Sequence, residues 1–141
     1  MINILKSQPA PECLASESQK VSGDYKCGDV LHRIKQDFKN KCYICETKGP
    51  TTINVEHFLP HRGDVQRKFD WNNLFYVCGH CNNTKLAKSQ YDNILDCTNS
   101  DNRVVDLIEH IFGPLKSDSL DFKAQIQSQI VLNTVALLEE V

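Results

Sequence analysis

The sequence predicts a small α+β domain with helices on either side of a cysteine-rich centre. Three observations predict this fold class. Two Cys-x-x-Cys pairs, Cys42/Cys45 and Cys78/Cys81, lie in the middle of the chain. Two short central stretches have the composition of β-strands, and other stretches place apolar residues at helical spacing. A chain of 141 residues suits one such domain with flanking helical segments.

The N-terminal segment, residues 1–40, is expected to form an irregular arm followed by one helix. Residues 1–28 contain two prolines and two glycines among polar residues, which is typical of irregular backbone. Residues 29–39 place four apolar side chains at helical spacing, and Asp29 could cap that helix.

The central segment, residues 41–90, is expected to hold two strands and a helix. Residues 51–58 are rich in β-branched residues and alternate apolar with polar side chains, and residues 74–77 form a short apolar run. Residues 61–72 between them are interpreted as a loop. Residues 82–90, which begin directly after the second cysteine pair, are interpreted as a helix.

The C-terminal segment, residues 91–141, is interpreted as a helical region that could dock a partner protein. Residues 103–112 fit a helix or a strand, and their apolar positions favour the helix. Residues 124–141 are expected to form the last helix. This segment carries three Lys or Arg against nine Asp or Glu, whereas residues 41–90 carry seven against four. The central segment is therefore better suited to face phosphates, although a solvated surface often shows a similar balance.

The N-terminus lacks the basic, apolar and small residues that mark a signal peptide in that order, and no apolar run approaches the roughly 18 residues of a membrane span. A cytoplasmic location is expected, where cysteines serve more often as metal ligands than in disulfides. The odd count of seven cysteines also argues against a fully paired disulfide framework. Cys13, Cys27 and Cys97 are therefore interpreted as buried or inert thiols.

The paired cysteines Cys42, Cys45, Cys78 and Cys81 have the spacing of a structural zinc site. Two thiolates on one tight turn can reach a tetrahedral Zn²⁺ at about 2.3 Å, and two such turns complete its shell without water. Thirty-two residues separate the two pairs, more than a plain zinc ribbon holds. The sequence therefore predicts that zinc clamps the two ends of an additional structure.

The residues inside and just after this insert follow one characteristic order: Glu56-His57, Pro60, Asn73-Leu74, and then Asn82 and Lys85 after the second cysteine pair. This order resembles the zinc-containing branch of the HNH endonuclease family over residues 42–85, about a third of the chain. The resemblance implies a ββα-metal core, in which two antiparallel strands and a helix grip one Mg²⁺ or Mn²⁺ ion.

The resemblance also implies roles for individual residues. His57 would be the general base that takes a proton from the attacking water, which suits a neutral imidazole in the cytosol. Glu56 and Asn82 would bind the catalytic ion through hard oxygen ligands. Asn73 would pin the loop that connects the strands, and Lys85 would contact a phosphate of the substrate.

Two positions depart from the family's usual pattern. The last metal-binding position is often His but here is Asn82, and the first is more often Asp but here is the longer Glu56. Adjacent residues of an ideal strand also point to opposite faces. Glu56 and His57 can therefore share one site only where the strand bends or ends, as the nearby Pro60 would allow.

Several of these residues have simpler interpretations. Asn82 could cap the helix that follows it. His61 could contact DNA, bind the ion or do neither. Arg62 and its basic neighbours Arg67 and Lys68 could follow a phosphate backbone or form an ordinary solvated loop.

Three further stretches, residues 23–30, 56–61 and 94–98, narrow the resemblance. They are similar to HNH proteins of Septu-type anti-phage systems, which are also found attached to some retrons. This resemblance implies an effector nuclease that cuts DNA and is held by an ATPase partner. The alternatives are a non-catalytic zinc module that binds nucleic acid or protein, and a pure interaction protein.

Overall fold

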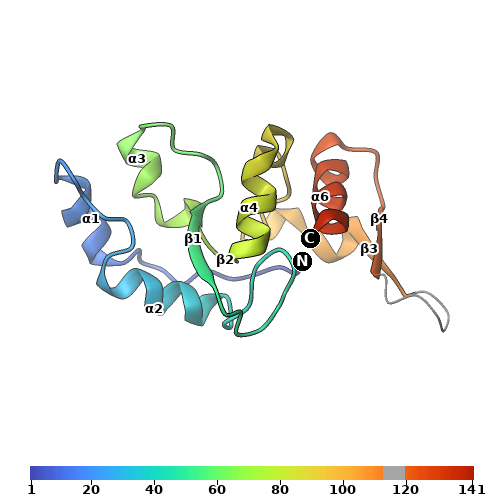
Figure 1. The fold of residues 1–141 in the computed structure, drawn as a ribbon, viewed down its shortest axis with the longest axis horizontal. Coiled ribbons are helices and arrows are strands. Elements are labelled where there is room, and N and C mark those ends of the chain that lie inside the picture. Colours follow the sequence, from blue (N-terminus) through green and yellow to red (C-terminus); the bar gives the residue numbers. More distant parts are fainter. Residues whose placement is uncertain (113–119) are drawn as a thin grey trace.

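The computed structural model describes residues 1–112 and 120–141, which form a small mixed α+β domain (Figure 1). The described residues contain two two-stranded sheets and six helices, so the predicted α+β class is confirmed. The helices are α1 (Glu12–Ser18), α2 (Gly28–Asp37), α3 (Val65–Lys68), α4 (Gly79–Ala87), α5 (Val104–Leu107) and α6 (Gln129–Glu140). The strands are β1 (Ile53–His57), β2 (Leu74–Cys78), β3 (Ile108–Phe112) and β4 (Leu120–Ala124).

The centre of the molecule consists of β1, β2 and α4. The two strands pair antiparallel, with Ile53 opposite Cys78 and His57 opposite Leu74. The helix α4 follows β2 directly and packs against both strands. Both strands lie where the sequence predicts them, whereas α4 begins at Gly79, three residues before the helix expected at residues 82–90. In Figure 1, α1, α2 and α3 lie on one side of this centre, and α6, β3 and β4 lie on the other.

An aromatic cluster joins the sheet to the helix α2, which matches the helix expected at residues 29–39. The ring of Phe75 in β2 contacts Phe38 just after α2, with centroids 5.6 Å apart, and Tyr43, at 5.0 Å. Phe58 stacks on Phe75 at 4.7 Å. All four rings are buried, so they form the core directly beneath the end of β1.

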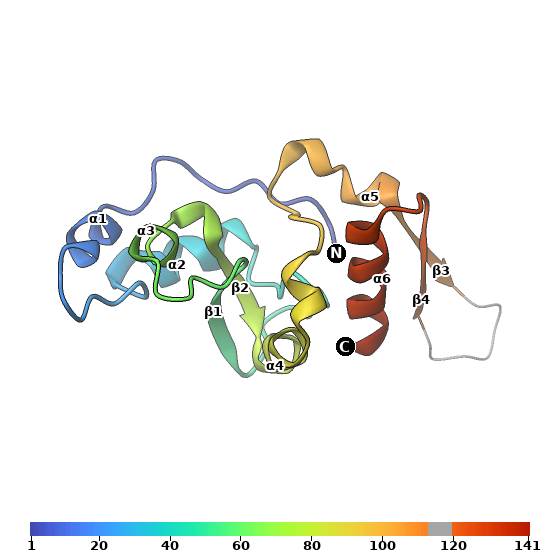
Figure 2. The same cartoon turned by 90° about the horizontal axis from the view of Figure 1, so that it is seen from above.

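The N-terminal arm is docked rather than free. It runs past the central strands to end beside α6 (Figure 2), and the amide of Ile4 donates to the carbonyl of Cys97. Lys6 is buried, and its ammonium donates to the carbonyls of Trp71 and Leu74. Burial lowers the pKa of Lys6 to about 8. The arm thus connects the two sides of the molecule.

One disulfide corrects the interpretation of the isolated cysteines. Cys13 in α1 and Cys27 beside α2 are bonded, with their Cα atoms 6.2 Å apart, and they are not the inert thiols that the sequence suggested. An odd cysteine count excludes complete pairing but not one local bond between packed helices. Cys97 is free and buried, as predicted.

The C-terminal region is not purely helical, so this expectation is wrong in part. Only residues 104–107 of the expected helix at 103–112 are helical, and Ile108–Phe112 forms the strand β3. The strand pairs antiparallel with β4, which ends at Ala124, the first residue of the expected last helix, and α6 begins only at Gln129. Residues 113–119 of this region lie outside the described residues. A separate observation is that none of the described helices has the length and apolar character needed to cross a membrane.

Candidate functional site

Four cysteines converge at one end of the central sheet. The sulfur atoms of Cys42, Cys45, Cys78 and Cys81 all lie within 4.8 Å of one another. The first pair lies on a tight turn, in which the amide of Glu46 donates to the carbonyl of Cys42 at 2.9 Å. The second pair spans the junction of β2 and α4, where the amide of Cys81 donates to the sulfur of Cys78. The chain thus presents two cysteine turns to one point.

This cluster fits a metal ion such as zinc. A tetrahedral ion with thiolates at about 2.3 Å places its ligands about 3.8 Å apart, and the sulfurs of Cys45 and Cys78 are 3.9 Å apart. Four thiolates leave no position for water or substrate, which is the arrangement of a structural site. A metal held here would tie the first turn to the end of β2, and so clamp both ends of the insert.

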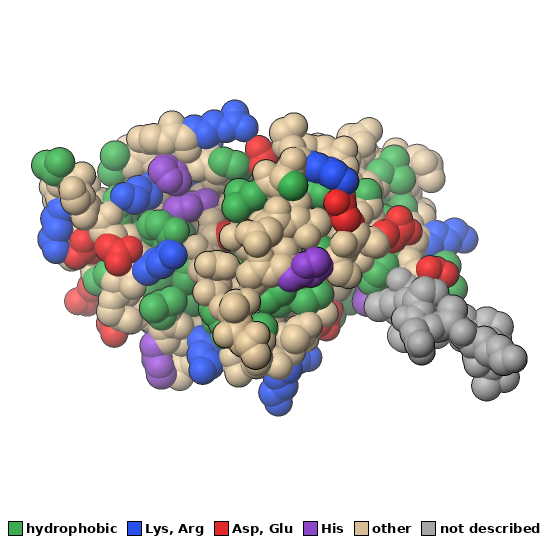
Figure 3. Space-filling view, viewed as in Figure 1, with side chains coloured by type: hydrophobic (Ala, Val, Ile, Leu, Met, Phe, Trp, Pro, Cys, Tyr) green, Lys and Arg blue, Asp and Glu red, His purple; other side chains and the backbone are tan. Residues whose placement is uncertain are grey.

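A second site lies in a pocket of about 440 Å³ between the end of β1 and the start of α4. Five residues that the sequence singles out line it, namely Glu56, His57, His61, Arg62 and Asn82. The strand β1 ends at His57, so both neighbours can line one pocket although they belong to one strand. Figure 3 shows histidine and basic side chains gathered on the surface over α3 and β1.

Glu56 is a buried carboxylate with one oxygen unsatisfied. Its side chain accepts a hydrogen bond from the hydroxyl of Tyr43, and it is only 6% exposed. The other oxygen, Oε2, has no hydrogen-bond partner among the described residues and lies 3.7 Å from the ammonium of Lys85. Burial raises the pKa of Glu56, with Lys85 opposing this effect. A buried carboxylate oxygen without a hydrogen-bond partner is chemically suited to bind a cation, and here the ammonium of Lys85 lies beside it.

His57 is held in one tautomer. Its Nε2 lies 3.0 Å from the carbonyl oxygen of Lys68, and because a carbonyl can only accept, Nε2 carries the proton. Nδ1 of the neutral ring is then free to accept a proton. Burial is the largest effect on the pKa of His57 and lowers it. The imidazole therefore remains a neutral base at lower pH than a solvated histidine.

His61 and Asn82 complete the pocket. The ring of His61 lies 4.7 Å from that of His57, and its Nδ1 accepts from the amide of Gly63 at 3.1 Å. This bond leaves Nε2–H of the neutral His61 ring as a donor. Asn82 lies in the first turn of α4 and is half-buried. Cys78 caps the helix, and its sulfur accepts a hydrogen bond from the amide of Cys81. Asn82 lies inside the helix and is therefore not its cap.

Asn73 pins the connecting loop, as the sequence predicts. Its side-chain oxygen accepts from the amide of Leu59 at 2.7 Å, and its side-chain nitrogen donates to the carbonyls of Leu59 and Arg67. The residue is buried, and it does not line the pocket. Asn73 therefore acts on the site through the backbone of the loop that follows β1.

Lys85 is not on the surface, which corrects the expectation that it contacts phosphate. It is 2% exposed, and its ammonium donates to the carbonyl of Phe58 at 2.9 Å beside Glu56. The helical face that carries Lys85 packs on the sheet, so the side chain points inward. Arg62, by contrast, is exposed, and among the described residues its one ion pair is with Asp92 at the surface. Such pairs are weak, so Arg62 can turn toward a polyanion.

Two residues of the site have no role in the sequence-based interpretation. Tyr43 lies between the first two cysteines and bonds Glu56, and Tyr25 from the N-terminal arm stands against His57, with centroids 4.4 Å apart. Their contacts depend on chain segments that meet only in the folded molecule.

Comparisons of the chain with family models, with curated proteins and with solved structures gave no match. The function of the pocket therefore has to be inferred from its own residues and their geometry.

Proposed function

We propose that this protein is a metal-dependent HNH endonuclease that hydrolyses phosphodiester bonds of DNA. One observation carries the proposal: the pocket brings a neutral, tautomer-fixed imidazole together with an unsatisfied buried carboxylate oxygen and a side-chain amide. The consecutive elements β1, β2 and α4, flanked by the cysteine cluster, support a ββα-metal core of the kind that the resemblance implies.

The donor set fits a hard divalent cation. Glu56 offers its unpartnered oxygen and Asn82 offers an amide oxygen, which suit Mg²⁺ or Mn²⁺ better than a soft metal. Among the described residues, the four cysteines form the single cluster of three or more His, Cys, Asp or Glu ligands. A cation at the second site would thus be held by two protein ligands, leaving its other positions to water and phosphate oxygens.

His57 supplies the proton transfer. Its Nδ1 accepts a proton from water, and the resulting hydroxide attacks phosphorus while the bond from phosphorus to the leaving sugar oxygen breaks. That oxygen takes up a proton from solvent water. The carbonyl of Lys68 keeps the opposite ring nitrogen protonated and stabilises the imidazolium that forms. A bound Mg²⁺ or Mn²⁺ supplies Lewis-acid stabilisation of the developing charge. His61 and Arg62 line the same pocket and present donors to the phosphate.

The biological setting proposed is anti-phage defence, with an ATPase as partner. It rests on the resemblance of the flanking stretches to Septu-type and retron-associated proteins. The acidic balance of residues 91–141 is compatible with docking to a protein rather than to DNA.

A non-catalytic zinc module is the second candidate, and Lys85 favours it. Its buried ammonium lies 3.7 Å from Glu56 and partly neutralises the carboxylate without any cation. In that case Glu56, Lys85 and Tyr43 would form a structural polar cluster, and the pocket would bind a ligand without chemistry.

Cleavage of plasmid DNA with Mg²⁺ or Mn²⁺ separates the two candidates. The wild-type protein, with its partner where required, is expected to nick or cut, and His57→Ala is expected to lower the rate at least about a hundredfold, the lower range for loss of a general base. His32→Ala, an exposed histidine on α2, is the matched control. Equal DNA binding by wild type and His57→Ala without any cleavage would favour the zinc module, and an RNA substrate in parallel tests the choice of DNA.

A further inference from the structure

We propose that the N-terminal segment Gly23–Cys27 forms one wall of the active site and that Tyr25 is a positioning residue for His57. This inference rests on the proposed function, because it assigns a role in catalysis to a contact with the general base. Tyr25 and Lys26 line the same pocket as His57, although more than 25 residues separate Lys26 from Asn54, the next lining residue along the chain.

The imidazole of His57 is in contact with two other rings. Tyr25 contacts one side, with centroids 4.4 Å apart and planes inclined by 55°, and His61 contacts it at 4.7 Å and 62°. The hydroxyl of Tyr25 donates to the carbonyl of Val55 at 3.4 Å, in the strand that carries His57. Together with the Lys68 carbonyl, these contacts restrict rotation of the imidazole, so that Nδ1 keeps one direction.

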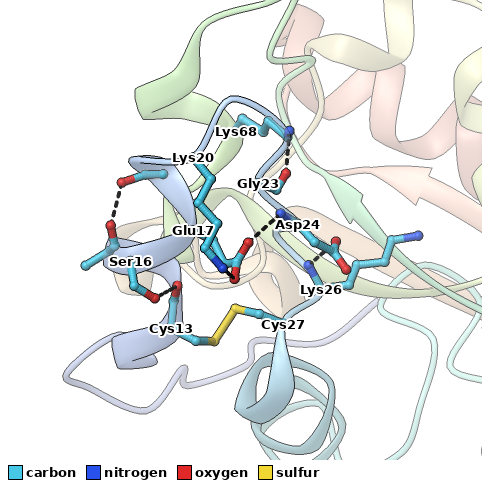
Figure 4. A network of polar contacts seen from close by, with 11 residues as sticks. Cys13, Ser16, Glu17, Lys20, Gly23, Asp24, Lys26, Cys27 and Lys68 are labelled. Atoms are coloured by element: carbon cyan, nitrogen blue, oxygen red, sulfur yellow. Dashed lines mark hydrogen bonds and ion pairs between the residues drawn. A yellow bond between two sulfur atoms is a disulfide. The ribbon is translucent and has the colours of Figure 1, made fainter.

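A chain of polar contacts holds this segment in place (Figure 4). The carboxylate of Glu17 accepts from the amide of Asp24, and the side chain of Asp24 accepts from the amide of Lys26. Lys68 acts twice, since its ammonium donates to the carbonyl of Gly23 at 2.8 Å and its own carbonyl accepts from His57. The segment and the general base are therefore tied to the same residue.

Close packing and the disulfide fix the position of the segment further. A Cβ atom on Gly23 would lie 2.0 Å from the carbonyl oxygen of Glu17 and 2.9 Å from the ring of Phe69, so this position requires glycine. The bond between Cys13 and Cys27 closes the loop that carries Tyr25. Loop closure reduces the number of alternative positions that the loop can take.

Kinetics of four variants test the proposal. Tyr25→Ala is expected to lower the cleavage rate at saturating DNA by about ten- to a hundredfold, the cost of a misplaced catalytic group, with DNA affinity nearly unchanged. Tyr25→Phe keeps the ring and should cleave within about twofold of wild type, because the hydroxyl bond is long. Cys13→Ser should show a smaller loss of the same kind. Val21→Ala, a fully exposed residue of the same loop, is the control.

Chemical modification of histidines provides a second readout that needs no cleavage. Diethyl pyrocarbonate acylates accessible neutral imidazoles, and mass spectrometry assigns the modified residue. Tyr25→Ala is expected to raise the modification rate of His57 several-fold, while His32 reacts as in wild type and the zinc content stays constant.

The inference is overturned if Tyr25→Ala matches Val21→Ala in both readouts, or if Tyr25→Phe is as slow as Tyr25→Ala. Unchanged activity in Cys13→Ser would show that the disulfide does not help to hold Tyr25 in position. If the wild-type protein cleaves no DNA, yet Tyr25→Ala still speeds up modification of His57, the nuclease function is contradicted. The contact by which Tyr25 positions His57 would then still stand.

Discussion

Glu56 and His57 are neighbours in β1, yet their side chains face different surroundings. Glu56 points toward Tyr43 and Lys85 in the interior, and His57 packs against rings at the surface of the pocket. Burial raises the pKa of the carboxyl group and lowers that of the imidazole, so it favours the uncharged form of both. A divalent cation in the pocket would stabilise the ionised carboxylate and leave the imidazole as the neutral base.

Asn73 is expected to be the most sensitive residue of the site for stability. Asn73→Ala removes three hydrogen bonds and leaves the amide and carbonyl of Leu59 and the carbonyl of Arg67 unsatisfied. The three bonds are partly buried, and a hydrogen bond contributes about 0.5–1.5 kcal/mol net, so we expect a loss of about 1.5–4.5 kcal/mol in the free energy of unfolding. Denaturant titration measures it.

The neighbouring residue provides the control for this experiment. Asn72 is exposed, and its side chain accepts one hydrogen bond within the described part of the chain, from the side chain of Gln8. Asn72→Ala should therefore change stability by about 0.5 kcal/mol or less. Equal effects of the two substitutions would show that the loop after β1 does not depend on Asn73.

For individual residues, the sequence predicts a role where that role depends on spacing along the chain. The sequence singles out the four cysteines, which form one cluster, and Glu56, His57 and Asn82, which line one pocket. The role of Lys85 was wrong because the packing of α4 decides which side chains are buried. Tyr25 was missed because its partner is distant in sequence.

Among the elements, α1 depends most on a covalent bond. It has seven residues and a single buried side chain, Leu14, so packing alone stabilises it little. The disulfide joins it to the start of α2 across a sequence separation of 14 residues.

Replacing Cys13 and Cys27 with serine should therefore destabilise the N-terminal region. For a loop of this length we expect a loss of about 2–3 kcal/mol, mainly because the unfolded chain regains conformational freedom. Limited proteolysis with trypsin should show faster cleavage at Lys20, which is exposed within the closed loop, while cleavage at exposed Lys88 on the other side stays constant. Unchanged rates at both sites would mean that packing alone holds α1.

The sequence predicts a helix or strand correctly where the local pattern of apolar residues determines it. The helix α2 shows a helical period, β1 an alternating one and β2 a short apolar run, and each lies at its predicted position. The segment at residues 103–112 fits both periods, and pairing with β4 selects the strand for Ile108–Phe112. A short window of sequence does not contain that partner, so the apolar spacing alone favours a helix there.

At the scale of the whole molecule, two links join parts that are distant in sequence. The N-terminal arm reaches Cys97 through Ile4 and the start of β2 through Lys6. The cysteine cluster joins the turn at Cys42 to the junction of β2 and α4. Because the pocket lies between β1 and α4, its geometry depends more directly on the cysteine cluster than on the N-terminal arm.

Zinc removal should therefore unfold the domain rather than merely loosen it. Structural zinc contributes about 10–16 kcal/mol in small zinc domains, which is as large as the whole stability of a typical protein. We expect one zinc per chain by elemental analysis, and loss of the cooperative thermal transition when a strong chelator removes it.

Cys78→Ser should bind zinc weakly and melt at lower temperature. Cys97→Ala, which removes a buried thiol outside the cluster, should keep full zinc content. A chelated chain that still unfolds cooperatively near the original temperature would show that the aromatic core holds the fold without metal.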